Sequence, residues 1–184
     1  MDKTIKILGI AGSLREGSYN RGALRAAADL VPDGAVLEIF DIAGLPEFVQ
    51  GQDENPPAKV VELKKAIREA DAILFSSPEY NYSVPGVLKN AIDWASRPYG
   101  DSAWEGKPAA IMGASPGAIG TARMQYHLRQ IMVFLNMFPI NRPEVMIGTA
   151  GDKFDAAGNL TDEKTKEFIK LMLQNLVDWT RKIS

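Results

Sequence analysis

The segment from residue 12 to residue 20, called here the first loop, has the composition of an anion-binding loop. It reads Gly12-Ser13-Leu14-Arg15-Glu16-Gly17-Ser18-Tyr19-Asn20. Its hydroxyl and amide side chains are neutral donors, the guanidinium of Arg15 can pair with phosphate oxygens, and its glycines let a ligand approach the backbone closely. A helix starting here would add free N–H groups and a partial positive charge. The first loop therefore predicts a phosphate site, and the alternative is an ordinary capped strand–helix turn.

The glycine spacing distinguishes this loop from two common nucleotide-binding motifs. A P-loop requires G-x-x-x-x-G-K-[ST], and a dinucleotide fingerprint requires G-x-G-x-x-G. The glycines here are Gly9, Gly12 and Gly17, which satisfy neither pattern. Because most of the donors are neutral, we expect the loop to hold a monophosphate.

The second loop, from residue 77 to residue 86, could form one wall for a flat ring. It reads Ser77-Pro78-Glu79-Tyr80-Asn81-Tyr82-Ser83-Val84-Pro85-Gly86. The two prolines stiffen it, while the tyrosines and the asparagine offer aromatic faces and polar edges. The alternative is a packed loop whose tyrosines simply fill space.

The third loop, from residue 113 to residue 120, supplies small residues where a large planar ligand needs clearance. Its first five residues also match the G-x-S-x-G pattern of a hydrolase nucleophile, with Ser115 at the centre. Pro116 follows this serine and has no N–H to give an oxyanion hole. Residues 116–126, before the single histidine at His127, contain no Asp or Glu, and no HGGG-type loop is present. We therefore interpret the match as accidental.

These loops follow strand-like runs that alternate with amphipathic helical segments. The strand-like runs are Ile5–Ala11, Val36–Asp41, Ala72–Ser76, Pro108–Gly113 and Glu144–Gly148. The helical segments are Asn20–Leu30, Pro57–Ala70, Gly86–Ala95, Ile119–Leu135 and Thr161–Trp179. This alternation predicts one α/β domain over residues 1–184, a doubly wound, five-stranded parallel sheet with helices on both faces. The flavodoxin-like order 2-1-3-4-5 places ligands beyond the carboxyl ends of the strands.

The last helical segment carries both a start signal and an apolar stripe. Thr161 is the expected N-cap, and two acidic residues follow it in the first turn. The residues expected to face inward are Phe168, Leu171, Met172, Leu176 and Trp179.

The composition excludes several kinds of chemistry. The chain has no cysteine and one histidine, which excludes disulfides, thiolate nucleophiles, iron–sulfur clusters and multi-histidine metal sites. Any redox chemistry must therefore come from a bound organic cofactor. The net charge of −2 provides no basic field for nucleic acid. Because the sequence shows neither a signal peptide nor a run of ~20 apolar residues, we expect a cytoplasmic protein without a membrane partner.

Two motifs carry a resemblance to a known family. The first loop resembles the phosphate loop of the NAD(P)H-dependent FMN reductase family, and the second loop, continued through Leu88–Trp94, is similar to that family's second signature. Residues 123–130 together with Pro143 and Glu144 resemble the quinone and chromate reductase branch. The similarity covers nearly the whole chain.

The resemblance implies a flavodoxin-like fold with one tightly but noncovalently bound FMN, and NAD(P)H as co-substrate. The residues that would hold the FMN phosphate are Ser13, Arg15, Ser18 and Asn20, with Tyr19 beside them. Those that would contact the isoalloxazine are Pro78, Glu79, Tyr80 and Asn81, with Ser115 at the same pocket. No catalytic side chain is assigned, because the flavin carries the chemistry.

The resemblance also implies a homodimer, which often pairs into a homotetramer. Arg123, Tyr126 and Glu144 would then take part in a hydrogen-bonded contact between dimers. The alternative for these three residues is a solvated helix face. His127 is assigned no role.

The function expected from these features is a ping-pong oxidoreductase. NAD(P)H would reduce the flavin and leave before an acceptor (a quinone, chromate, an azo compound or free flavin) takes electrons at the same face. The alternative is a non-enzymatic electron carrier of the flavodoxin type. Such carriers have a threonine-rich phosphate loop without arginine and are usually strongly acidic, whereas this chain has Arg15 and a net charge of only −2. The sequence leaves the choice between NADPH and NADH open.

Overall fold

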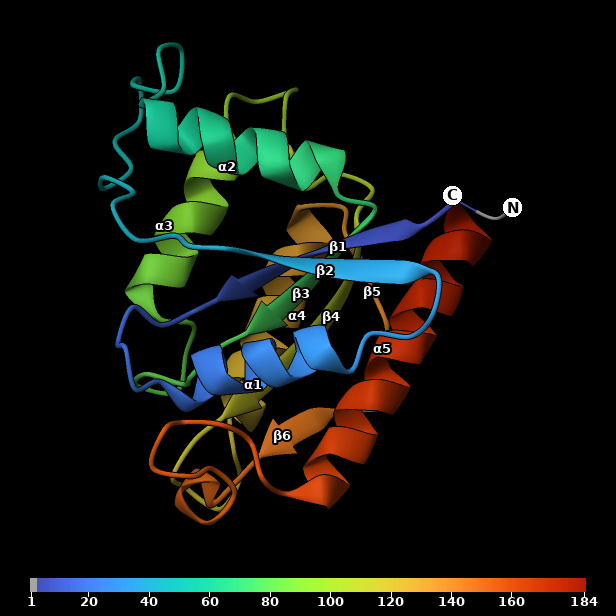
Figure 1. The fold of residues 1–184 in the computed structure, drawn as a ribbon. Coiled ribbons are helices and arrows are strands. Elements are labelled where there is room, and N and C mark those ends of the chain that lie inside the picture. The colour runs from blue at the N-terminus through green and yellow to red at the C-terminus, as the bar shows by residue number, and fades with distance from the viewer. Residues whose placement is uncertain (1–2) are drawn as a thin grey trace.

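A parallel sheet between two layers of helices forms the centre of the computed structural model, which describes residues 3–184 (Figure 1). The strands are β1 (Ile5–Ala11), β2 (Ala35–Phe40), β3 (Ala72–Ser76), β4 (Pro108–Ala114), β5 (Phe138–Pro139) and β6 (Val145–Ile147). Their order is β2-β1-β3-β4-β5, and β6 also pairs with β4. The doubly wound sheet and its 2-1-3-4-5 order are confirmed.

The helices cover the two faces of this sheet as the crossover connections require. They are α1 (Tyr19–Asp29), α2 (Ala58–Glu69), α3 (Gly86–Ala95), α4 (Ala122–Phe134) and α5 (Glu163–Ile183), with a 3-10 turn at Ala150–Asp152. Apolar residues of α1 and α5 pack with one face of the sheet, and those of α2, α3 and α4 pack with the other. The chain therefore buries one core on each side of the sheet.

The middle strands owe their position to continuous apolar sequence. All residues of β3 and β4 are buried, because helices lie over both of their faces. Along β4, Ala109 and Ile111 face one core, while Ala110 and Met112 face the other. The edge strand β2 has only partly buried and exposed residues. The carboxyl ends of β1, β3 and β4 thus lie side by side.

The far edge of the sheet differs from the prediction of a single fifth strand. Two short strands pair with β4. Phe138 of β5 lies opposite Pro108 of β4, and Met146 of β6 lies opposite Gly113 of β4. Pro143, which lies between these two short strands, has no N–H to give to a ladder, so continuous pairing along residues 138–147 is interrupted. The sheet therefore has six strands, and the predicted run Glu144–Gly148 corresponds to β6.

The start and the faces of α5 also differ from the prediction. Asp162, not Thr161, is the N-cap: its carboxylate accepts hydrogen bonds from the N–H of Thr165 at 2.8 Å and from the hydroxyl of Thr165 at 2.6 Å. Both residue types cap helices well, but the hydroxyl of Thr161 donates to the carbonyl of Lys153 at 3.1 Å. Phe168 and Leu171, expected to face inward, are 45 % and 50 % exposed. Met172 and Leu176 are buried as predicted, and the other buried apolar residues of α5 are Ile169, Leu173 and Val177.

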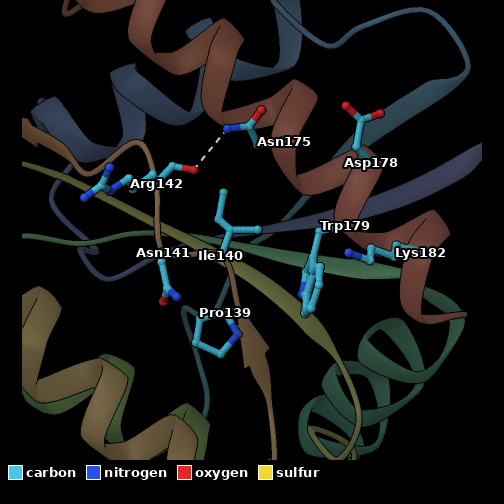
Figure 2. A pocket seen from close by; sticks show the side chains of 8 residues that line it. All are labelled: Pro139, Ile140, Asn141, Arg142, Asn175, Asp178, Trp179 and Lys182. Carbon is cyan, nitrogen blue, oxygen red and sulfur yellow. Dashed lines mark hydrogen bonds between the residues drawn. The ribbon is translucent and has the colours of Figure 1, made fainter.

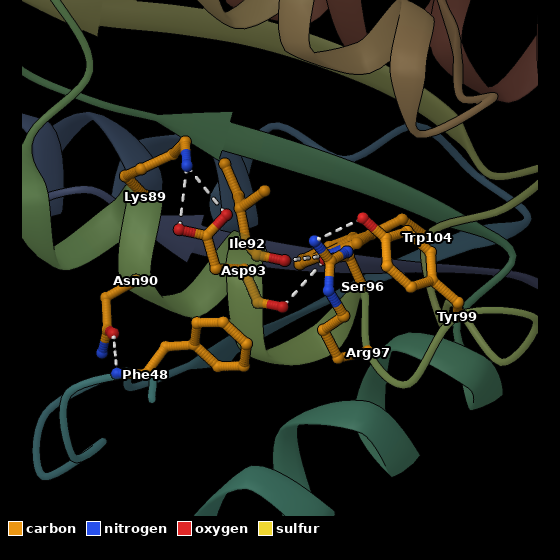
Figure 3. A network of polar contacts seen from close by, with 9 residues as sticks. All are labelled: Phe48, Lys89, Asn90, Ile92, Asp93, Ser96, Arg97, Tyr99 and Trp104. Carbon is orange, nitrogen blue, oxygen red and sulfur yellow. Dashed lines mark hydrogen bonds and ion pairs between the residues drawn. The ribbon is translucent and has the colours of Figure 1, made fainter. Parts of the chain in front are cut away.

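The connection from α3 to β4 is fixed by polar contacts (Figure 3). The buried indole of Trp104 donates to the carbonyl of Ile92 at 3.0 Å. The guanidinium of Arg97 donates to the hydroxyl of Ser96 at 3.2 Å and lies 4.1 Å from the ring centre of Tyr99. These contacts hold the end of α3 next to the strand that carries the third loop.

Candidate functional site

The three loops meet at the carboxyl ends of β1, β3 and β4. A Cβ atom on Gly12 would overlap the hydroxyl of Ser77 and lie 2.7 Å from its Cβ. A Cβ on Gly113 would overlap the carbonyl oxygen of Ser77 and lie 3.0 Å from the Cβ of Thr121. Only glycine fits at these two positions without a shift of the neighbouring chain. The structure thus brings the first, second and third loops into direct contact.

Asn20 connects the start of α1 to the end of β4. Its side-chain amide donates to the carbonyl of Ala114 at 2.9 Å and accepts from the N–H of Ala114 at 2.8 Å. The hydroxyl of Ser76, at the end of β3, donates to the Asn20 carbonyl at 2.9 Å. Asn20 is 2 % exposed, so these hydrogen bonds form in a buried place. The residue predicted to bind phosphate therefore also joins the three loops.

The first loop presents a set of free backbone donors. Within residues 3–184, no protein acceptor faces the N–H groups of Ser13, Leu14, Glu16, Gly17 and Tyr19. The Ser18 hydroxyl caps α1 by accepting from the N–H of Asn20 at 3.2 Å, and the Ser13 hydroxyl accepts from the N–H of Arg15 at 3.4 Å. Each hydroxyl keeps its own proton for a ligand. The loop is therefore rich in donors that the protein leaves unused.

Arg15 is the charged group of the first loop. It is exposed, and within the described residues it forms no ion pair with a carboxylate. Its guanidinium carbon lies 5.9 Å from the ring centre of Tyr19. Tyr19 in turn packs against Phe154, with ring centres 5.1 Å apart. Arg15 is thus placed beside the free N–H groups with its charge available to an anion.

The second loop contains a tight turn with exposed rings. The backbone N–H of Tyr80 donates to Ser83 at 3.1 Å, and the N–H of Ser83 donates back to Tyr80 at 2.9 Å. Between them, Asn81 and Tyr82 adopt left-handed backbone conformations with φ values of 49° and 65°. Tyr80 is 51 % exposed. This turn is therefore a shaped, accessible part of the second loop.

The side chain of Glu79 points to α4. Its carboxylate accepts from the N–H groups of Arg123 at 3.0 Å and Met124 at 3.1 Å, and from the guanidinium of Arg123 at 2.5 Å. The carboxylate closes the first turn of α4, whose N-cap residue Thr121 makes no side-chain cap bond within residues 3–184. Sequence reasoning missed this pairing, because the two residues belong to separate motifs.

Ser115 lies at the start of the third loop, partly buried. Its hydroxyl accepts from the N–H of Gly117 at 3.2 Å, and its own N–H donates to Ile147 at 3.0 Å. The single histidine is bonded elsewhere: Nδ1 of His127 lies 2.8 Å from the hydroxyl of Ser83. The serine and the histidine of the hydrolase pattern thus have different partners.

Two pockets differ in their relation to the loops. One, of about 210 Å³, borders the first loop and is lined by α1 and the end of β2, with Ser13, Arg21 and Asp41 in its wall. A larger one, of about 350 Å³, lies between β5 and α5 and is walled by Pro139 and Trp179 (Figure 2). The lining of the larger pocket includes no residue of the three loops. Its size alone therefore does not make it the functional site.

The residues predicted to lie between dimers divide into two groups. Arg123 is engaged with Glu79 of its own chain. Tyr126 is 57 % exposed, and a hydrogen bond to Glu144 with the nearby negative charge raises the pKa of Tyr126 above its usual value. Tyr126 and Glu144 are therefore close together on the surface, while Arg123 contacts Glu79 of the second loop.

No helix among residues 3–184 combines the length and the apolar character needed to cross a membrane.

Comparison with known proteins finds a matching family model and several similar enzymes. The family model for NADPH-dependent FMN reductase matches residues 5–152. An NAD(P)H-dependent FMN reductase of Pseudomonas aeruginosa is 55% identical over 185 residues, covering 100% of this chain and 99% of the relative. A 2-hydroxy-1,4-benzoquinone reductase of a Burkholderia species is 43% identical over 177 residues, with 96% and 97% covered.

A solved structure supports the same relationship. The flavoenzyme FerB from Paracoccus denitrificans, described as an NAD(P)H:(acceptor) oxidoreductase, superposes with a TM-score of 0.88 at 37% identity. The superposition covers 97% of this chain and 98% of FerB. These relatives are enzymes by name, which favours the enzyme hypothesis over the electron carrier. Fold, loops and sequence similarity together establish that the chain belongs to the NADPH-dependent FMN reductase family.

Proposed function

We propose that this protein holds FMN at the three loops and uses NAD(P)H to reduce quinones and related acceptors. The observation that carries the proposal is the cluster of unused N–H groups and one unpaired guanidinium in the first loop. The second loop, which carries the exposed turn, begins at Ser77 against Gly12 of the first loop. This pairing of an anion cradle with a stiff wall suits a flat ring that carries one phosphate.

The first loop fits a phosphomonoester in donor number and in charge. One of its free N–H groups, that of Tyr19, belongs to the first turn of α1, where the helix dipole favours a negative ligand. The hydroxyls of Ser13 and Ser18 would donate their protons to phosphate oxygens, and Arg15 would supply the positive charge. Asn20 would act mainly by holding α1 against β4, because Ala114 already bonds both ends of its side-chain amide.

The second and third loops fit the ring. Pro78, Tyr80 and Asn81 would line one side of the isoalloxazine, and Ser115 would lie at its other border. When bound, FMN supplies the hydride chemistry between NAD(P)H and the acceptor. The protein's own contribution is to bind and orient the ring and to leave one ring face open to both substrates. No side chain is needed as an acid or a base, so we assign no catalytic residue.

Quinones are the acceptor class that the relatives favour. The Burkholderia relative is named a 2-hydroxy-1,4-benzoquinone reductase, and a Solanum tuberosum relative, 48% identical over 176 residues, is named an NAD(P)H:quinone oxidoreductase. An open flavin face would also admit chromate, azo compounds and free flavin. We propose quinones as the principal class.

A homodimer or homotetramer is part of the proposal. The outer side of α4 leaves large apolar side chains in water: Tyr126, Val133 and Phe134 are 57 %, 81 % and 73 % exposed. Large exposed apolar side chains that gather on one helix favour a protein interface there. Light scattering coupled to size exclusion would determine the mass of the assembly.

The absorption spectrum of the purified protein tests the cofactor, and steady-state kinetics test the reaction. We expect a flavin spectrum, NADPH or NADH consumption with benzoquinone, and parallel double-reciprocal lines when both substrates are varied. Intersecting lines would contradict ping-pong turnover. A flavin spectrum without NADPH or NADH consumption would favour the electron carrier. A colourless protein that does not take up FMN would refute the proposal.

A further inference from the structure

We propose that α4 holds the second loop in its flavin-binding shape, with Glu79 and His127 as positioning residues on either side of the Tyr80–Ser83 turn. The proposal rests on the proposed function, because it concerns the wall of the same site. It assigns the carboxylate of Glu79 to α4, and it leaves the backbone of the second loop as the part that faces the ring.

The turn needs outside support because its backbone is strained. Asn81 and Tyr82 are consecutive residues at φ 49° and φ 65°. Asparagine tolerates this left-handed region, but for a residue with a bulky side chain it costs roughly 1–2 kcal/mol. Strained conformations persist where surrounding contacts fix them, and they cluster at functional sites. Two backbone hydrogen bonds between Tyr80 and Ser83 close the turn, and α4 adds the contacts described next.

The first contact is the carboxylate of Glu79, immediately before the turn. Its side chain is 6 % exposed, and it accepts from two backbone N–H groups of the first turn of α4 and from the guanidinium of Arg123. Charge-assisted hydrogen bonds at a helix N-terminus are among the stronger polar contacts in proteins. A nearly buried carboxylate with these three donors is fully engaged by α4.

Two further contacts act on the turn itself. The guanidinium carbon of Arg123 lies 3.6 Å from the ring centre of Tyr82, the residue with the larger positive φ. On the far side, the hydroxyl of Ser83 is 2.8 Å from Nδ1 of His127, one helical turn further along α4. Arg123 therefore contacts both Glu79 and Tyr82, and His127 holds the end of the turn. Side chains at positions 123 and 127 lie on one side of the helix.

These contacts predict how the residues affect flavin binding. If Glu79 acts through α4, removing its charge and removing Arg123 disturb the same interaction, so their effects must be non-additive. If the carboxylate touched the ring directly, Glu79 variants would change the flavin spectrum while Arg123 variants would not. The two explanations thus give different patterns.

A double-mutant cycle with Glu79→Gln and Arg123→Met tests this. We expect each single variant to weaken FMN binding by about tenfold, and the double variant to be no more than about threefold weaker than either single one. The position of the flavin absorption band should stay unchanged in all three. The exposed ion pair of Lys89 and Asp93 on α3 is the matched control, and Lys89→Met with Asp93→Asn should leave FMN affinity within about twofold.

The contribution of His127 is tested by a conservative rescue. The side-chain amide of asparagine can place a polar atom near the position of Nδ1, so His127→Asn should retain FMN affinity. His127→Leu should weaken it about threefold, and Ser83→Ala should add nothing further to the leucine variant. Equal losses in His127→Asn and His127→Leu would contradict a positioning role for this histidine.

Hydrogen exchange of the second loop gives a readout that needs neither FMN nor activity. In FMN-free protein, Glu79→Gln and Arg123→Met should each speed exchange of the backbone amides of residues 80–83, whereas the Lys89 and Asp93 variants should not. If Arg123→Met fails to fold, Arg123→Lys retains the charge but loses the forked donor and should show a smaller change in the same direction. Unchanged exchange, or fully additive losses of affinity, would overturn the proposal. Failure of the wild-type protein to bind FMN would instead refute the proposed function and leave the exchange test valid.

Discussion

Replacement of Asn20 by alanine would remove the two hydrogen bonds that join α1 to the end of β4. Both bonds are short, at 2.9 and 2.8 Å, and their partners are the carbonyl and the N–H of Ala114. Because Asn20 is 2 % exposed, water cannot readily replace the lost groups. Each buried backbone group left without a partner costs about 1–3 kcal/mol.

The expected loss of stability follows from these contacts. Two unpaired groups cost roughly 2–6 kcal/mol together, and the better helix propensity of alanine returns about 0.5 kcal/mol. We take about 3 kcal/mol as the working value, which lowers the melting temperature of a domain of this size by about 6–12 °C. FMN affinity should fall as well, because Asn20 joins the three loops.

Thermal unfolding of FMN-free protein, followed by circular dichroism, measures this change without the stability that a bound ligand adds. Asn175→Ala is the matched control, because Asn175 is also helical but makes one hydrogen bond, at 3.1 Å, from a partly exposed position. We expect the control to cost about 0.5–1 kcal/mol. A change of 1 kcal/mol in the free energy of unfolding shifts the melting temperature of a domain of this size by at least about 2 °C. If the melting temperatures of Asn20→Ala and Asn175→Ala differ by less than this, the reasoning is refuted. A large loss of stability with unchanged FMN affinity would refute the part that links Asn20 to the site.

Two other predictions concern the close contact at Gly12 and the pH dependence of the helix cap at Asp162. Gly12→Ala should destabilise the protein by about 1–3 kcal/mol through overlap with the second loop. As a control, Gly86→Ala should have little effect, because a Cβ atom there meets no atom within 4 Å. Chemical denaturation would compare the two variants, and equal stabilities would contradict the overlap. Asp162→Ala should lose about 0.5–2 kcal/mol at neutral pH. Hydrogen bonds from the hydroxyl and the N–H of Thr165 lower the pKa of Asp162 below 3.8. The cap therefore stabilises the fold above the unfolded-state pKa, and its contribution disappears as the pH falls through the folded-state pKa. A difference between wild type and Asp162→Ala that stays constant from pH 7 to about pH 2 would contradict this assignment.

The elements of this protein could be predicted because their signals are local. Apolar residues recur at strand or helix period, and glycines and prolines mark the ends of the elements. The limits of this approach lie where two local signals compete. Thr161 and Asp162 are both good caps, but Asp162 caps α5 while the hydroxyl of Thr161 is bonded to the carbonyl of Lys153. Likewise, the run Glu144–Gly148 predicts the strand β6, whereas the two-residue strand β5 is recognised only from its pairing with β4.

The amino-acid sequence by itself determined the order of the sheet and the three loops where a phosphate and a ring would bind. Hydrophobic period and loop composition are properties of neighbouring residues, so they can be recognised without a partner. The tertiary structure alone decided the polar pairings: Asn20 with Ala114, 94 residues away, and Glu79 with Arg123, 44 residues away. A buried amide or carboxylate takes whichever donors and acceptors the packed helices and strands bring within about 3 Å. Those positions are fixed only when the whole sheet and its helices have assembled.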